Sequence, residues 1–139
     1  MGLDISTKSG KSYHYGYSAL HSVRSLAAAT QGVAPFVPAG TDKERFPWSV
    51  VVTHAVFPNL MCHSDCQGSY TMTGRVGDAQ LLNGNLPGLV DELRLLKRLS
   101  RQIKEGELVP DKKWAVQVLN SLLAVAEDAL KHEEPLNFR

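Results

Sequence analysis

WAVQVLNSLLAVAEDAL, residues 114–130, is the segment that decides the fold. Its apolar residues recur every three or four positions, which is the period of an α-helix. The start signals Pro110 and Asp111 precede it, and we expect the helix to end near His132. Two adjacent apolar rows make its surface wide enough to be largely buried. They are Trp114, Val118, Leu122, Val125 and Ala129, and beside them Ala115, Leu119, Leu123, Ala126 and Leu130.

Two more helices are predicted upstream. The first is YSALHSVRSLAAATQG, Tyr17–Gly32, with Ser18 as its N-cap and Gly32 at its left-handed C-terminal position. The second begins near Pro87 and is closed by Gly106. Its acidic residues come early and its basic residues late, an order that complements the helix dipole.

Strands are predicted at both ends of the chain and in its middle. GLDIS (Gly2–Ser6) and EPLNFR (Glu134–Arg139) alternate apolar and polar residues, and WSVVVTHAVF (Trp48–Phe57) is β-branched and aromatic. The Gly-punctuated segments Thr7–Gly16 and Ser64–Asp78 are predicted loops. This order predicts an α+β fold, a small and mostly antiparallel sheet packed by about three helices.

Length and composition favour one soluble domain, residues 1–139. The chain is 43% hydrophobic and 21% charged, close to the globular average. Its net charge of +1 argues against strong nucleic-acid binding, which needs a basic excess. No apolar run is long enough to span a membrane, no secretory signal begins the chain, and Cys62 and Cys66 suggest no disulfide framework. We therefore expect a cytoplasmic protein without membrane contact.

Gly10-Lys11-Ser12 resembles the end of a phosphate-binding P-loop, but the rest of that motif is missing. A P-loop has a second glycine five residues before Gly10, and this chain has Ile5 there. The residues after Ser12 are aromatic and are not predicted to be helical. A nucleoside-triphosphatase of the P-loop class is therefore not expected.

The residues that follow form a better candidate site. Gly16, Tyr17 and Ser18 lie at the start of a predicted helix, where free backbone amides and the positive end of the dipole attract anions. Arg24 would add positive charge, and the aromatic rings offer faces on which a base can stack. The alternative is that two of the tyrosines pack in the core. The candidate ligand-binding residues here are Tyr13, Tyr15, Gly16, Tyr17, Ser18, His21 and Arg24.

CHSDCQG, which starts at Cys62, is the second candidate, and three chemistries remain open for it. As a metal site it lacks the second ligand pair that structural zinc uses, and we expect no metal. As a catalytic site, Cys66 would be the nucleophile, His63 the base and Asp65 the group that orients it. As a binding site, Ser64 and Asp65 would hydrogen-bond hydroxyl groups, and His63 would donate to a phosphate. The structural alternative is a simple turn at the end of a strand.

These elements together resemble a family of small, uncharacterised proteins of bacteria and phages. The shared motifs are an N-terminal Gly-Leu-Asp-Ile (residues 2–5), a Tyr-Ser…Arg element (17–24), a His-Ser-Asp-Cys element (63–66) and a similar C-terminus (134–138). Gln67 stands where the family usually has an acid, which puts a metal-ligand role there in doubt. The resemblance implies that the motif residues belong together in one pocket, and it transfers no function.

We therefore expect a protein that binds a small anionic ligand of nucleotide type without a cofactor, and that forms a homo-oligomer. Because members of this family occur in phage genomes, the resemblance suggests one use, a sponge that sequesters a cyclic nucleotide immune signal. One alternative is an enzyme in which Cys66 and His63 act on a similar ligand. Another is an inhibitor module that meets an acidic partner through basic residues of the helix after Pro87, namely Arg94, Lys97, Arg98, Arg101 and Lys104.

Overall fold

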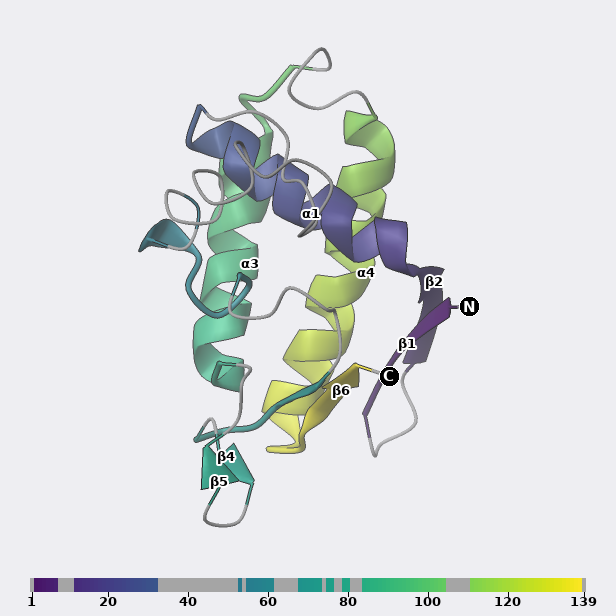
Figure 1. Cartoon of the computed structure of the whole chain (residues 1–139), viewed down its shortest axis with the longest axis vertical. Helices are drawn as coiled ribbons and strands as arrows, with labels where there is room; N and C mark the ends of the chain where they lie inside the picture. The colour runs from purple at the N-terminus through teal and green to yellow at the C-terminus, as the bar shows by residue number, and fades with distance from the viewer. Residues whose placement is uncertain are drawn as a thin grey trace.

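The computed structural model describes residues 2–7, 12–32, 53, 55–61, 68–73, 75–76, 79–80, 84–104 and 111–138. Within these ranges lie three long helices, α1 (Tyr17–Thr30), α3 (Leu86–Ser100) and α4 (Lys112–Lys131), and a small sheet beside α4 (Figure 1). The predicted α+β class is confirmed, including a long last helix that packs against the other two.

The sheet has four strands in the order β2-β1-β6-β3, and every pairing in it is antiparallel. The strands are β1 (Gly2–Ser6), β2 (Ser12–Gly16), β3 (Gly68–Tyr70) and β6 (Leu136–Phe138). Because β1 pairs with β6, the two ends of the chain lie close together (Figure 1). A separate two-stranded ribbon pairs β4 (Arg75–Val76) with β5 (Ala79–Gln80).

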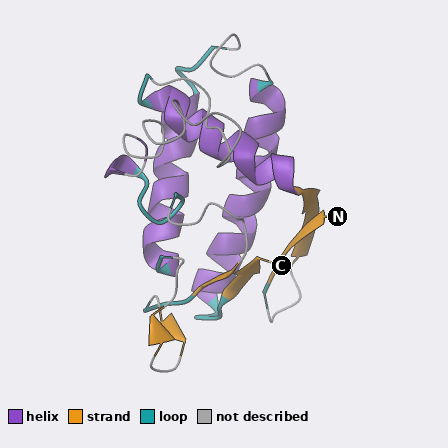
Figure 2. Ribbon diagram, viewed as in Figure 1, coloured by secondary structure: helices purple, strands orange, loops and turns teal. Residues whose placement is uncertain are grey.

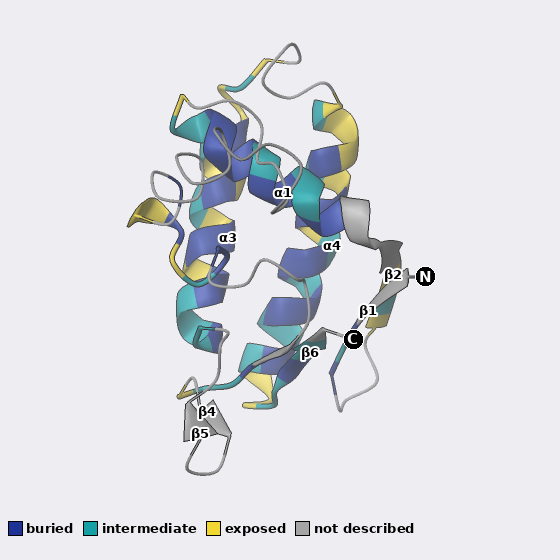
Figure 3. Ribbon diagram, viewed as in Figure 1, coloured by how far each residue is buried: buried dark blue, intermediate teal, exposed yellow. Residues whose placement is uncertain are grey.

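Helices α3 and α4 run antiparallel and pack side by side, and α1 crosses both of them (Figure 2). Their inner faces meet in one hydrophobic core (Figure 3). Trp114, which was predicted on the buried surface of α4, is 38% exposed because it stands in the first turn, at the end of the helix. The buried residues of α4 are Ala115, Val118, Leu119, Leu122, Leu123, Val125, Ala126 and Ala129.

Several local signals are confirmed. Asp111 caps α4, since its Oδ1 accepts from the Trp114 amide at 3.1 Å. Gly32 has φ +73°, the left-handed conformation that glycine adopts without strain. The predicted C-terminal strand is present as β6. No helix in the described part of the chain is both long enough and apolar enough to cross a membrane.

The strand predicted at Trp48–Phe57 is wrong where the structure describes it. Residues 53, 55 and 56 are helical, and the Phe57 amide donates to the Thr53 carbonyl at 2.9 Å. The Met61 amide donates to the Phe57 carbonyl at 3.0 Å, so helical hydrogen bonding continues to residue 61. Tertiary contacts override the strand preference of β-branched residues here. The rest of the segment, residues 48–52 and 54, lies outside the described residues.

The loop predictions are also partly wrong. Residues 12–16, expected in a loop, form β2, because its tyrosines favour a strand and β1 offers a full pairing partner. Residues 68–70 and 75–76, expected in a loop, form β3 and β4.

Two helix boundaries differ from the prediction. Helix α1 begins at Tyr17, so Ser18 lies inside its first turn and is not the N-cap. Helix α3 ends at Ser100, with Arg101 as its C-cap, well before Gly106, which lies outside the described residues.

Candidate functional site

The start of α1 follows β2 without an intervening loop. Gly16 ends β2 and Tyr17 opens α1. The first-turn amides of a helix have no carbonyl partner within it, and the anion site expected for this reason at this point stays a prediction from the sequence. The side chains of Tyr15, Tyr17 and Ser18 lie outside the described set.

Tyr13 and His14 point in different directions, as neighbours on a strand do. Tyr13 is half-buried and packs against the hydrophobic core, whereas His14 is exposed. At least one ring of the tyrosine-rich segment therefore has a packing role, which was the alternative interpretation.

Arg24 lies two turns into α1 and is almost completely buried, at 1% exposure. Its Nε donates to the backbone carbonyl of Leu60 at 3.1 Å. A buried guanidinium is costly unless it is hydrogen-bonded, so this contact ties α1 firmly to the segment that contains Leu60. That segment continues directly into the His-Ser-Asp-Cys motif.

Glu92 of α3 holds the same segment from another direction. Its carboxylate accepts from the Asn59 amide at 2.9 and 3.1 Å, and from the Leu60 amide at 3.0 Å. It also accepts from Nδ2 of the Asn59 side chain. The carboxylate is 7% exposed, so these donors replace the water that it loses on folding.

Asn59 connects this contact to the start of α3. Its Oδ1 accepts from the Asn85 amide at 2.9 Å, and Asn85 is the N-cap of α3. A Cβ added at Gly84 would lie 1.8 Å from Asn59 Oδ1, so glycine is required for this close approach. The Tyr70 hydroxyl of β3 donates to the Asn59 carbonyl at 2.7 Å.

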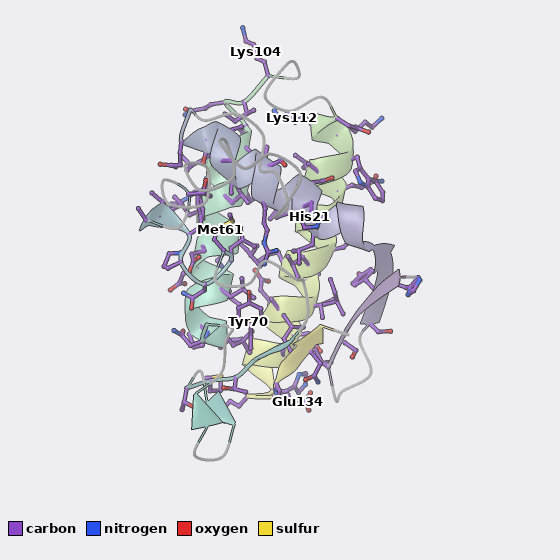
Figure 4. All side chains as sticks on the ribbon, in the orientation of Figure 1. His21, Met61, Tyr70, Lys104, Lys112 and Glu134 are labelled. Atoms are coloured by element: carbon purple, nitrogen blue, oxygen red, sulfur yellow. The ribbon has the colours of Figure 1, made fainter. Side chains whose placement is uncertain are left out.

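We call Phe57–Met61 the clamped turn, because α1, β3 and α3 all hold it. Met61 and Tyr70, which Figure 4 labels, are both buried in the hydrophobic core. The peptide groups of Leu60 lie between two buried charges, since its amide donates to Glu92 and its carbonyl accepts from Arg24. Each charge is thereby solvated by a backbone dipole, and we expect the two charges to balance each other across this one residue.

His21 lies on α1 one turn before Arg24 (Figure 4) and is half-buried. Burial, and then the nearby positive charge of Arg24, lower the pKa of His21 below its usual value of 6.5. The imidazole is therefore neutral at pH 7. It can offer a hydrogen bond or a ring face to a ligand, but no positive charge.

The motif residues His63, Ser64, Asp65 and Cys66 lie outside the described residues, as does Cys62. The last described residue before them is Met61, the end of the clamped turn. Among the described residues, no three His, Cys, Asp or Glu side chains gather in a way that would hold a metal ion.

An open hollow of about 410 Å³ lies between α3 and α4, apart from these residues. Side chains of both charge signs line it, and none of the predicted site residues does so. The lining residues are Arg94, Ala124, Glu127, Asp128 and Lys131.

Glu92 and Asn59 were not predicted as site residues from the sequence. A signal for Glu92 was available, because it lies three residues after Leu89 and four before Leu96, on the apolar face of α3. An acid at such a position needs buried donors. Nothing in the sequence indicated that Asn59 would supply them.

Comparison with protein-family models, with curated proteins and with solved structures finds no match to this chain.

Proposed function

We propose that the protein binds a small anionic ligand of the nucleotide type. One observation carries the proposal, the buried hydrogen bond from Arg24 to the carbonyl of Leu60 at 3.1 Å. It joins the helix of the first candidate segment to a residue only three positions before His63. The hydrogen bond thus links the end of the first candidate segment to the residues just before the second, about 40 residues further along the sequence. This link supports a shared pocket.

The chemistry of the residues assigns a role to each part of such a ligand. A phosphate group would bind the first-turn amides of α1 at Gly16–Ser18, where the helix dipole favours negative charge. Arg24 would strengthen this attraction through its buried positive charge, which water screens little. Neutral His21 would supply a hydrogen bond or a ring face.

The remaining residues would recognise the base and the sugar. A base would stack on Tyr15 or Tyr17, because Tyr13 packs largely against the core. Ser64 and Asp65 would hydrogen-bond the sugar hydroxyls, and His63 would donate to the phosphate. Ligand sites of this kind often form between subunits, so a homo-oligomer belongs to the same proposal.

A narrower form of the proposal follows from the family resemblance. In that form the protein is a sponge that sequesters a cyclic nucleotide immune signal and releases it unchanged. The enzyme alternative, with Cys66 and His63 acting on the ligand, would leave an altered product instead.

Native mass spectrometry tests the proposal directly. The purified protein is measured alone and after incubation with a mixture of mononucleotides, dinucleotides and cyclic nucleotides. We expect a retained nucleotide at a fixed ratio to the number of protein copies. Heat denaturation should then release it with its mass unchanged. If no nucleotide is retained, the proposal is wrong, and if the released compound has a new mass, the protein is an enzyme.

A pair of matched variants separates specific binding from general charge effects. Asp65→Asn removes a predicted ligand contact, and we expect it to lower nucleotide retention about tenfold, or ~1.4 kcal/mol. Asp91→Asn makes the same chemical change at an exposed position on α3, so retention should not change. Equal retention by the two variants would contradict the role of Asp65.

A further inference from the structure

The second half of α3 presents a row of exposed cations, which we call the basic stripe. Their spacing of three or four residues places them on one side of the helix axis. Its helical part, from Arg94 to Arg101, is about 10 Å long at a rise of ~1.5 Å per residue. The stripe consists of Arg94, Lys97, Arg98, Arg101 and Lys104, and all five are exposed.

Most of these charges have no counter-charge among the residues that the structure describes. Arg94 donates to Glu127 Oε1 at 3.2 Å in an exposed ion pair. The side chains of the other four make no ion pair with any residue that the structure describes. The negative end of the α3 dipole accounts for cations in the last turn, but only by a few tenths of a kcal/mol to ~1 kcal/mol each.

More cations gather at this end of the molecule, where helix stability does not favour them. Lys112 and Lys113 stand in the first turn of α4, at the positive end of its dipole. Figure 4 shows Lys104 and Lys112 at the same end of the structure, since α3 and α4 are antiparallel. The stability of α4 therefore does not explain why these cations stand there.

An apolar row runs beside the basic stripe. Leu95, Leu99 and Ile103 are spaced four residues apart, and each is only partly buried against the core. A protein interface usually has an apolar core and a polar rim, and an apolar row beside a charged row provides both. Arg98 and Arg101 add two guanidinium groups, which bind carboxylates through paired hydrogen bonds.

We propose that the basic stripe and its apolar row form a docking surface for an acidic amphipathic helix of another protein. Such a helix would place Glu or Asp residues opposite the cations and Leu-type residues against Leu95 and Leu99. Nucleic acid fits less well, because the chain has a net charge of only +1 and Asp91 and Asp111 border the cations. This docking surface is independent of the proposed ligand site.

The test uses the full chain and a designed probe. The probe is a fluorescent helical peptide of about 20 residues that carries one row of Glu and an adjacent row of Leu. Fluorescence anisotropy measures its binding to the protein at low and high salt. We expect binding that weakens as salt rises, and no comparable binding of a peptide with every Glu replaced by Gln.

Two variants with the same change in net charge serve as test and control. Arg98→Gln with Arg101→Gln removes two charges of the stripe, and we expect the Kd to rise about tenfold, or ~1.4 kcal/mol. Lys131→Glu reverses one exposed cation at the opposite end of α4 from Lys112 and Lys113, and the Kd should change less than about twofold. Circular dichroism checks that both variants fold.

Three outcomes would overturn the docking surface. They are no detectable binding of the acidic peptide by the unmodified protein, an equal loss of affinity in the test and control variants, and tighter binding of a DNA duplex than of the peptide at physiological salt. None of them bears on nucleotide retention, which native mass spectrometry measures separately.

Discussion

The clamped turn and the basic stripe hold charged side chains in opposite environments, one buried and one exposed. Arg24 of α1 and Glu92 of α3 are buried against the clamped turn. The backbone of Asn59 and Leu60 supplies hydrogen bonds to both charges. On the basic stripe, cations are exposed and almost all of them are unpaired among the described residues. Buried charges hold the structure in one arrangement, whereas exposed ones cost little and stay available to a partner.

The comparison predicts very different costs for removing one acid from each region. Glu92→Ala removes the buried carboxylate that accepts from the amides of Asn59 and Leu60, so we expect a loss of about 3–5 kcal/mol in the free energy of unfolding. Glu127→Ala removes only the exposed partner of Arg94 and should cost less than about 1 kcal/mol. Urea unfolding measures both. Similar losses would show that the clamped turn is not held by Glu92.

Gly84, just before α3, provides a test of where the Asn59 side chain lies. Gly84→Ala introduces a Cβ that would lie 1.8 Å from Asn59 Oδ1, and we expect a loss of about 1–3 kcal/mol from overpacking. The loss should shrink when Asn59 is first changed to Ala, because the clashing atom is then absent. Thermal unfolding of the single and double variants checks this. An unchanged cost in the Asn59→Ala background would mean that the Asn59 side chain does not occupy this space.

The lowered pKa of His21 predicts how the free energy of unfolding depends on pH. The pKa is lowered in the folded state, so below pH 6.5 the unfolded chain takes up the proton more readily. The His21 contribution to stability is therefore complete above pH 6.5 and is lost as the pH falls toward its lowered folded value. Urea unfolding between pH 7.5 and 5 should show this decline, and His21→Gln should make it shallower. A decline of the same steepness in His21→Gln would rule out His21 as its source.

The basic stripe should give the smallest effect on stability. Because the side chains of Arg98 and Arg101 are exposed and make no ion pair with a described residue, changing both to Gln should lower the unfolding free energy by no more than about 1 kcal/mol, mainly through their lost interaction with the helix dipole. A thermal melt of the double variant measures it. A large loss would mean that these arginines stabilise the fold, and the stripe would then not be free for a partner.

The sequence predicted the elements whose signals are local. The period of α4, the Asp111 cap and the left-handed Gly32 follow from residues that are neighbours in the chain. The turn at residues 53–61 was mistaken for a strand, because its helical conformation depends on contacts with distant elements. For the same reason Arg24 was predicted as a charge for a ligand, and its contact with Leu60 could not be foreseen.

In the candidate site, too, the features set by neighbouring residues were predicted, and those set by tertiary packing were not. Position along the chain predicted that Gly16–Ser18 would open a helix, and α1 begins within that stretch. Glu92, Asn59 and Tyr70 come from three separate segments, and their convergence depends on how α3 and β3 pack. A single sequence contains no period that links such residues, so this part of the site required the structure.

A double-mutant cycle on Arg24 and Glu92 tests the central claim most directly. Each single change to Met leaves the other buried charge uncompensated, whereas the double change removes both charges. If the two charges are balanced across Leu60, the double variant should lose about 1–3 kcal/mol less than the sum of the single losses. If the losses add within ~0.5 kcal/mol, Arg24 and Glu92 act independently and the clamped turn is not the unit described here.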